Sequence, residues 1–281
     1  MAEDKHLKVL ADGLSFPEGP RWYAGALYFS DFYTHRVHKL APDGELNVVT
    51  TVPNQPSGLG WLPDGRMLIV SMLDRKLVRL EPDGRLVEHA DLNAVATWHC
   101  NDMVVDSCGR AYVGNFGFDT HTPDTAPIKA NLAMVSPDGS VTRAAEGFWF
   151  PNGSVITPDG RTLVVAETRA NRLTAFEIGR EGELGARRVW ADLGVHFPDG
   201  IALDAQGQIW VADPRNRCLI RVAEGGDITS KVELDRGAYA CALGGIDGHT
   251  LYVCAATGSG KHAKSRLEGQ ILAMRVDVPA A

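Results

Sequence analysis

Apolar and polar residues alternate in blocks that recur six times along the chain. Each copy has a short apolar run, a turn that ends in glycine and a second run rich in Val, Ile, Leu and Tyr, a pattern typical of a β-hairpin. A third run and a further glycine turn lead into a fourth run, so each copy predicts four antiparallel strands. The turn glycines of the six first hairpins are Gly25, Gly65, Gly109, Gly160, Gly207 and Gly248.

Six copies of four strands, repeated about every 40 to 50 residues, predict an all-β chain folded as a six-bladed β-propeller. The sixth copy stops after its third strand, residues 269–278, whereas residues 6–19 hold an extra strand before the first copy. We expect this N-terminal strand to complete the last blade, because a closed ring leaves no open sheet edge. Residues 1–281 would then form one domain. An open array of repeats would leave both chain ends unexplained.

The tripeptide Pro-Asp-Gly occurs six times, beginning at residues 42, 63, 82, 137, 158 and 198. The first five copies fall in predicted hairpin turns, which favour all three residue types. The sixth is displaced, because Asp199 precedes its turn glycine, Gly207, by eight residues and lies at the entry to an innermost strand. Counting back by seven or eight residues in the other copies gives the equivalent positions, which are Glu18, Ser57, Asn101, Asn152 and Cys241.

These positions predict a metal site, because the first residues of innermost strands converge at one opening of the central channel. Glu18, Asn101, Asn152 and Asp199 would face a common space from four blades. Two carboxylates held close together repel each other, and a cation relieves that repulsion. A donor set made of oxygen favours Ca²⁺, or Mg²⁺ and Mn²⁺, over Zn²⁺, which stays a further alternative. The other interpretation is that these residues cap the channel and bind water.

A second set of residues ends the second strands of the copies. They are Asp31, Met72, Asn115, Glu167, Asp213 and Ala255. In a propeller these ends lie on the face where the innermost strands begin. Asn115 and Glu167 are therefore predicted to contact substrate or to support the metal-binding residues, and solvated loop positions are the alternative for each one singly. Two long connections, residues 116–131 and 256–269, should project over the same face and form walls or a lid. The second could instead be unstructured decoration.

Charge and cysteine content narrow the function classes. The formal net charge is -7 without a basic cluster, which argues against nucleic-acid and membrane partners and favours a small molecule. Five cysteines without Cys-x-x-Cys spacing argue against a disulfide framework. The N-terminus has no apolar signal segment and no stretch is long enough to span a membrane, so we expect a cytoplasmic protein, monomeric or weakly homo-oligomeric.

Four segments together resemble one known family. They are FPEGPRW (16–22), HCNDMVVDSCGRAYVG (99–114), FPNGSVITPDGRTLVVAET (150–168) and FPDGIALDAQGQIWVAD (197–213). In this order they resemble the signature segments of the senescence-marker-protein/gluconolactonase/luciferin-regenerating-enzyme family, which includes regucalcin-like proteins. The resemblance covers nearly the whole chain. It implies a six-bladed propeller that binds one divalent cation, and many members of the family hydrolyse lactones.

The resemblance also implies roles for single residues. The family's metal-ligating Glu, Asn and Asp match Glu18, Asn152 and Asp199, and its Asp is also a proposed general base. The Asn that reaches metal or substrate matches Asn101. Two departures stand out: His99 replaces an Arg associated with sugar hydroxyls, and Glu167 stands where relatives often carry Asp. The first departure weakens the case for an aldonolactone.

The leading hypothesis is a divalent-metal-dependent lactone hydrolase. The cation would polarise the ring carbonyl, Asp199 would activate water, and Asn101 and Asn152 would orient the carbonyl. His99 is a candidate acid or base that also contacts substrate, since residues i and i+2 of a strand share a side. Aromatic residues flank the strand entries and favour a substrate more apolar than gluconolactone; they are Trp98, Trp149, Phe150 and Phe197.

Two other functions remain open from the sequence. One is a calcium-binding propeller with a structural metal and a non-catalytic binding role. The other is a related propeller hydrolase that acts on phosphotriesters or aryl esters. A serine hydrolase is disfavoured, because the chain has no Gly-x-Ser-x-Gly nucleophile elbow.

Overall fold

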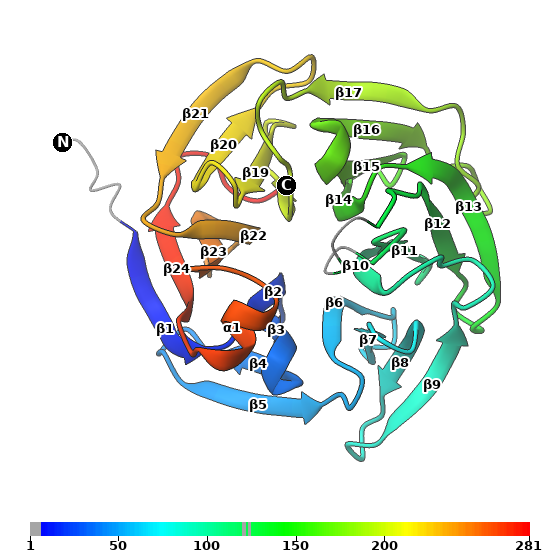
Figure 1. Cartoon of the computed structure of the whole chain (residues 1–281), viewed down its shortest axis with the longest axis horizontal. Helices are drawn as coiled ribbons and strands as arrows, with labels where there is room; N and C mark the ends of the chain where they lie inside the picture. The colour runs from blue at the N-terminus through cyan, green and yellow to red at the C-terminus, as the bar shows by residue number, and fades with distance from the viewer. Residues whose placement is uncertain (1–6, 120–121, 123–124) are drawn as a thin grey trace.

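The computed structural model describes residues 7–119, 122 and 125–281, and it shows six four-stranded antiparallel sheets around a central channel (Figure 1). This confirms the six-bladed propeller that the sequence repeats predict. The innermost strand of each blade lines the channel, and the fourth strand lies at the rim. Residues 120, 121, 123 and 124, which belong to the connection 116–131, lie outside the described residues.

The blades follow one another in chain order. Blade one contains β2 (Pro17–Tyr23), β3 (Ala26–Asp31), β4 (Arg36–Leu40) and β5 (Leu46–Thr51). Blade two contains β6 (Pro56–Trp61), β7 (Met67–Ser71), β8 (Lys76–Leu80) and β9 (Leu86–Asp91). Blade three contains β10 (Cys100–Val105), β11 (Ala111–Asn115), β12 (Ala130–Val135) and β13 (Val141–Phe148).

Blade four contains β14 (Pro151–Ile156), β15 (Thr162–Glu167), β16 (Arg172–Glu177) and β17 (Arg188–Asp192). Blade five contains β18 (Ile201–Leu203), β19 (Ile209–Asp213), β20 (Cys218–Val222) and β21 (Ile228–Glu233). Blade six contains β22 (Gly237–Gly244), β23 (Thr250–Ala256), β24 (Gly269–Arg275) and β1 (Lys8–Leu14). The described helices are α1 (Lys261–Ser265) and two single turns of 3₁₀-helix, η1 (Phe32–Thr34) and η2 (Thr168–Ala170).

The N-terminal strand closes the ring. β1 pairs antiparallel with β24, and the register joins Lys8 to Ala273 and Leu14 to Gly269. Figure 1 shows β1 in dark blue beside β24 in red, so the two ends of the chain share one sheet. The expected completion of the last blade by the N-terminal strand is therefore confirmed.

The hydrophobic core lies in layers between neighbouring blades. Between blades two and three, for example, Leu68 and Val70 of β7 pack in one cluster with Met103 and Val113 of β10 and β11. All five cysteines are free thiols, as the sequence predicts. Among the described residues, none of the helices has the length and apolar character needed to cross a membrane.

The sixth Pro-Asp-Gly differs physically from the turn copies. In the turn copies the glycine has a left-handed backbone, as at Gly44 with φ of 92°, and the Asp43 side chain accepts a hydrogen bond from the Glu45 N–H. Gly200 serves another purpose, since a Cβ there would lie 2.5 Å from the Ala240 Cβ. Glycine at this position lets the innermost strands of blades five and six approach each other.

Candidate active site

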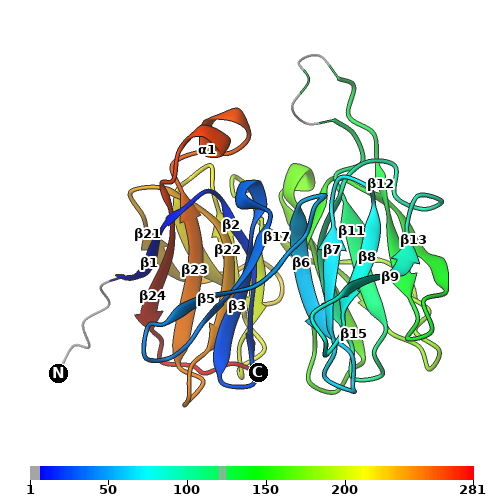
Figure 2. The ribbon, with the colours of Figure 1, turned by 90° about the horizontal axis from the view of Figure 1, so that it is seen from below.

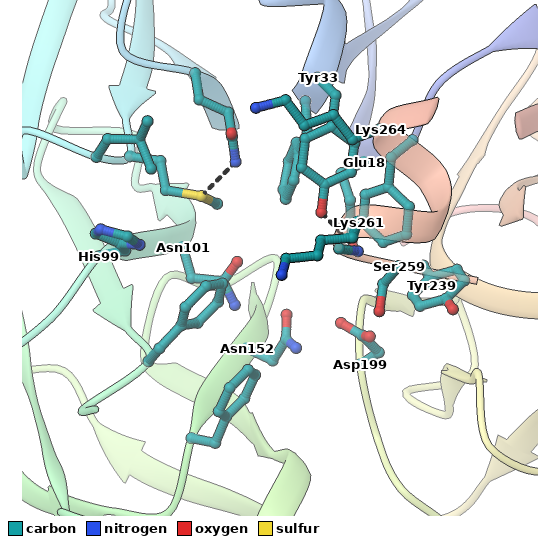
Figure 3. A pocket seen from close by; sticks show the side chains of 18 residues that line it. Glu18, Tyr33, His99, Asn101, Asn152, Asp199, Tyr239, Ser259, Lys261 and Lys264 are labelled. Carbon is teal, nitrogen blue, oxygen red and sulfur yellow. Dashed lines mark hydrogen bonds between the residues drawn. The ribbon is translucent and has the colours of Figure 1, made fainter. Parts of the chain in front are cut away.

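A cavity of about 350 Å³ opens at one end of the channel, on the face where the innermost strands begin. Each blade contributes residues from the start of its innermost strand. They are Phe16, Glu18, Gln55, His99, Asn101, Phe150, Asn152, Asp199 and Tyr239. The four predicted oxygen donors, Glu18, Asn101, Asn152 and Asp199, all line this one cavity, although they come from four blades (Figure 3).

A local backbone pattern places the donors. Glu18, Asn152 and Asp199 each lie between a proline and a glycine. The innermost strand also changes register with its neighbour beside the donor. In blade one the β2/β3 pairing shifts between Glu18 and Arg21, and in blade four the β14/β15 pairing shifts between Pro151 and Ser154. Such irregularities redirect side chains. The glycine also permits close packing of adjacent blades, because a Cβ at Gly153 would lie 2.6 Å from the backbone N of Ile201.

Blade six departs from the counted position. Cys241 is buried away from the cavity, and its thiol contacts the backbone oxygens of Gly200 and Trp210 between blades five and six. Tyr239 lines the cavity instead. Counting from Gly248 misplaced the equivalent residue, because β22 pairs regularly with β23 from Gly244 back to Ala240 and its register shifts only between Ala240 and Ala238, whereas blades two, three and four shift after three paired residues.

Burial and mutual repulsion set the electrostatics of the cavity floor. The pKa of Glu18 is raised from 4.5 to about 8, mainly by burial and to a smaller extent by the nearby Asp102 carboxylate. The Gly19 N–H, which donates a hydrogen bond to Glu18 at 3.0 Å, opposes this rise. Burial and the charge of Glu18 likewise raise the pKa of Asp199, while a hydrogen bond from Asn152 lowers it. Two carboxyl groups therefore share a space in which neither ionises readily.

Arg21, a half-buried cation that lowers the pKa of Glu18, is paired with another carboxylate. The Arg21 guanidinium donates to Asp102 Oδ1 at 2.7 Å and to the Met103 carbonyl. It compensates Asp102, and it lowers the pKa of Glu18 less than burial raises it. The sequence pattern gave no sign of this residue beyond its place three positions after Glu18.

The donor set fits a hard divalent cation. Two carboxylates and two amide groups supply only oxygen ligands, and the cation would balance the two negative charges. In addition, the buried Asn101 Nδ2 is without a hydrogen-bond partner within the described residues. An Asn101 amide that is not held by the protein can turn its oxygen toward a ligand in the cavity.

The second predicted ring lies behind the cavity rather than around it. Asn115 donates to the Asn131 carbonyl at 2.7 Å, and Glu167 accepts from the Trp149 N–H at 2.8 Å and from Thr174 at 2.6 Å. Both side chains are buried and neither is among the residues that line the cavity. Their contact with substrate stays a prediction that this geometry does not favour, since both side chains hold the backbone in place.

Aromatic side chains form the walls. The rings of Phe116 and Phe150 stack with centroids 4.8 Å apart, and Phe16 meets Tyr239 edge to face at 4.6 Å. Of the four aromatic residues that flank the strand entries, Phe150 lines the cavity. The others point elsewhere: Trp98 stacks on His99, Trp149 lies under Lys129 and Phe197 lies under Arg215.

The two long connections rise on the face of the cavity (Figure 2). Residues 116–131 contribute Phe116 to the wall. Residues 256–269 include α1 and contribute Ser259, Gly260, Lys261 and Lys264. This second connection is anchored rather than loose, because the Gly260 N–H donates to the Tyr33 hydroxyl at 2.8 Å.

Another group of metal-ligand types occurs in blade five. His196, Asp213 and Cys218 bring one ligand atom each within 4.8 Å of one another. The group does not line the cavity, and Asp213 already accepts from His196 at 2.8 Å and from Asn216 at 2.7 Å. Burial raises the pKa of the Cys218 thiol to about 11, which disfavours the thiolate. Nothing in the spacing of His196, Asp213 and Cys218 along the chain predicts this cluster.

With the fold and the site in place, comparison with known proteins gives the family. The model of the SMP-30/gluconolactonase/LRE-like region matches residues 16–257. The chain belongs to this family. It is 27% identical over 259 residues to pentonolactonase XacC of Haloferax volcanii, a match that covers 90% of this chain and 86% of the relative.

A second curated relative and a solved structure are also similar to this chain. A 6-deoxy-6-sulfogluconolactonase of Pseudomonas putida is 25% identical over 266 residues, which cover 90% of this chain and 88% of the relative. The crystal structure of the calcium-binding protein regucalcin from Agrobacterium tumefaciens superposes with a TM-score of 0.81 at 23% identity, covering 97% of this chain and 94% of the other. The family resemblance seen in the four sequence segments is therefore confirmed.

Proposed function

We propose that the protein is a divalent-metal-dependent lactone hydrolase. The observation that carries the proposal is the group of Glu18, Asn101, Asn152 and Asp199 at the floor of one cavity, with two carboxyl groups whose pKa is raised. Two relatives named as lactonases, pentonolactonase XacC and 6-deoxy-6-sulfogluconolactonase, support hydrolysis of a lactone.

Calcium is the proposed ion, with Mn²⁺, Mg²⁺ or Zn²⁺ as alternatives. All four proposed ligands offer oxygen, which Ca²⁺ prefers, and one similar structure is that of a calcium-binding regucalcin. When bound, the cation would supply positive charge that polarises the lactone carbonyl and stabilises the negative charge that develops on its oxygen.

The protein's own residues would handle the water and the proton. Asp199 would take a proton from a water molecule as the water oxygen attacks the carbonyl carbon. The ring C–O bond then breaks, and the leaving oxygen receives a proton from Asp199 or from His99, which also lines the cavity. Asn101 and Asn152 would orient the carbonyl through hydrogen bonds.

The walls suggest the body of the substrate. Phe16, Phe116 and Phe150 present apolar faces, and His99 stands where gluconolactonase-like relatives often carry Arg. We therefore propose a lactone less hydroxylated than a sugar lactone. A second candidate function, calcium binding without catalysis, is favoured by the resemblance to the regucalcin structure.

The deciding experiment measures proton release from a panel of sugar, aliphatic and aromatic lactones. Metal-stripped protein is assayed with Ca²⁺, Mn²⁺, Mg²⁺ or Zn²⁺ added back. We expect turnover that depends on metal, and that falls by at least about 100-fold in Asp199→Asn because the base is lost.

Asp43→Asn is the matched control, since Asp43 lies in an exposed Pro-Asp-Gly turn. It should keep wild-type turnover. If no lactone is hydrolysed with any metal while Ca²⁺ still raises the melting temperature, the binding function replaces the enzymatic one.

A further inference from the structure

Helix α1 brings two lysines to the mouth of the cavity. Lys261 and Lys264 both line it, and residues three apart on a helical turn lie on neighbouring positions of one face. Figure 3 shows the Lys261 side chain extending from α1 toward the space between Asn101 and Asn152. The cavity therefore has a cationic side in addition to its acidic floor and aromatic walls.

The two ammonium groups are not used by the protein. Within the described residues, neither has a salt bridge or a side-chain hydrogen bond. Other charges of the same connection are paired, since Glu268 accepts from Thr257 and lies 3.3 Å from Arg266. Among residues 7–119, 122 and 125–281, Lys261 and Lys264 are therefore positive charges that face the cavity without an acidic partner.

The connection holds these lysines in place. Ala263, between them, is 3% exposed and packs against Phe16, Phe32 and Met72 of the apolar cluster beside the cavity. At the far end of the connection, the Glu268 carbonyl accepts a hydrogen bond from Arg236 at 3.1 Å. The positions of Lys261 and Lys264 thus follow from packing on both sides of α1.

Charge balance then points to the substrate. A divalent cation on the floor would balance Glu18 and Asp199, which leaves the charges of Lys261 and Lys264 in excess. We propose that the preferred lactone carries an anionic group, such as a carboxylate, sulfonate or phosphate, several bonds from its ring carbonyl, and that Lys261 and Lys264 bind that group. This inference rests on the proposed function and specifies its substrate class.

The experiment compares two lactones of the same ring and chain, one ending in a methyl group and one in a carboxylate. The wild type should favour the carboxylate in kcat/KM by roughly tenfold, because Lys261 and Lys264 are exposed and each exposed ammonium group contributes modestly. In Lys261→Gln/Lys264→Gln this preference should fall to about one, mainly through a higher KM for the carboxylate. Added NaCl should reduce the wild-type preference.

Lys8→Gln/Lys231→Gln is the matched control, because it removes the same charge from the outermost strands β1 and β21. It should keep the wild-type preference. The proposal is overturned if the wild type does not favour the carboxylate, or if the Lys261/Lys264 variant loses turnover of both lactones equally. Equal loss would mean that the lysines balance the acidic floor instead.

A binding assay separates this proposal from the lactonase proposal. The corresponding lactams, which resist hydrolysis, are titrated calorimetrically into the calcium-supplemented protein. If no lactone turns over but the carboxylate lactam binds about tenfold more tightly than the methyl lactam, only the hydrolase assignment fails. If both lactams bind alike, or neither binds, the anionic-group proposal fails.

Discussion

Three of the four side chains on the cavity floor belong to residues set between a proline and a glycine. The side chain between them faces the channel, and the glycine allows the next blade to approach, as at Gly153 and Gly200. The tripeptide Pro-Asp-Gly therefore has two structural roles, a hairpin turn in most copies and a strand entry that faces the cavity at residues 198–200. The position of the tripeptide within the blade decides which of the two roles it has.

Glu167 provides a test of the residues behind the floor. It is 0% exposed, and it accepts hydrogen bonds from the Trp149 N–H and Thr174 and pairs with Arg172 at 2.9 Å. Glu167→Ala should lower the free energy of unfolding by about 3 kcal/mol, because it leaves these donors without an acceptor inside the protein. Urea denaturation measures the loss.

Glu177→Ala, on the exposed end of β16, is the control and should change stability little. KM for a hydrolysed lactone separates the roles of Glu167. A wild-type KM in Glu167→Ala agrees with a positioning role, whereas a large rise in KM with wild-type stability would restore the substrate contact that the sequence predicted.

At the scale of elements, β1 and α1 complete what the six repeats leave open. β1 covers the outer edge of β24, and α1 carries lysines to a cavity otherwise built from strand entries. β1 supplies the fourth strand of the sixth copy from the other end of the chain, whereas α1 lies outside the repeated pattern. β1 closes the ring, and α1 adds positively charged side chains to the cavity.

Removal of residues 1–14 tests closure by β1. We expect the melting temperature to fall by roughly 10 °C, because β24 loses its partner and the buried Leu14 side chain is lost. Thermal unfolding followed by circular dichroism measures the change. A peptide of residues 7–14 should restore part of it, and a scrambled peptide should not. An unchanged melting temperature in the shortened protein would show that β1 adds no stability.

At the scale of the whole molecule, the cavity floor links blades one, three, four and five through Glu18, Asn101, Asn152 and Asp199. No single blade could form this site. An ion bound there would stabilise the folded ring, because a ligand that binds only the folded state raises the free energy of unfolding.

The metal-free protein should lose stability as pH rises. The folded-state pKa of Glu18, about 8, lies above its ordinary value of 4.5, and the pKa of Asp199 is raised too. The folded state therefore holds more protons than the unfolded state between these values, so the contribution is fully present below about pH 4.5 and is lost as pH rises toward 8. Melting temperatures across this range measure it.

Calcium should reverse this dependence, since protons compete with the ion for the same carboxylates. Stabilisation by Ca²⁺ should grow from about pH 5 to about pH 8. In Glu18→Gln, the melting temperature of the metal-free protein and its increase with Ca²⁺ should both depend less on pH. A slope that is the same in wild type and Glu18→Gln would show that other groups govern the pH response.

The repeated hydrophobic pattern and its glycine turns were enough to predict the blades, their number, the ring closure and the residues that converge on the floor. This works because strand periodicity, turn chemistry and ring closure are local or counting constraints. The tertiary structure decided what sequence spacing does not encode. A register shift that lies farther from the hairpin turn in blade six than in blades two to four put Tyr239 rather than Cys241 at the cavity. Packing of Ala263 turned two lysines toward the cavity, and hydrogen bonds drew Glu167 and Asn115 behind it. Each of these depends on contacts between segments far apart in the chain.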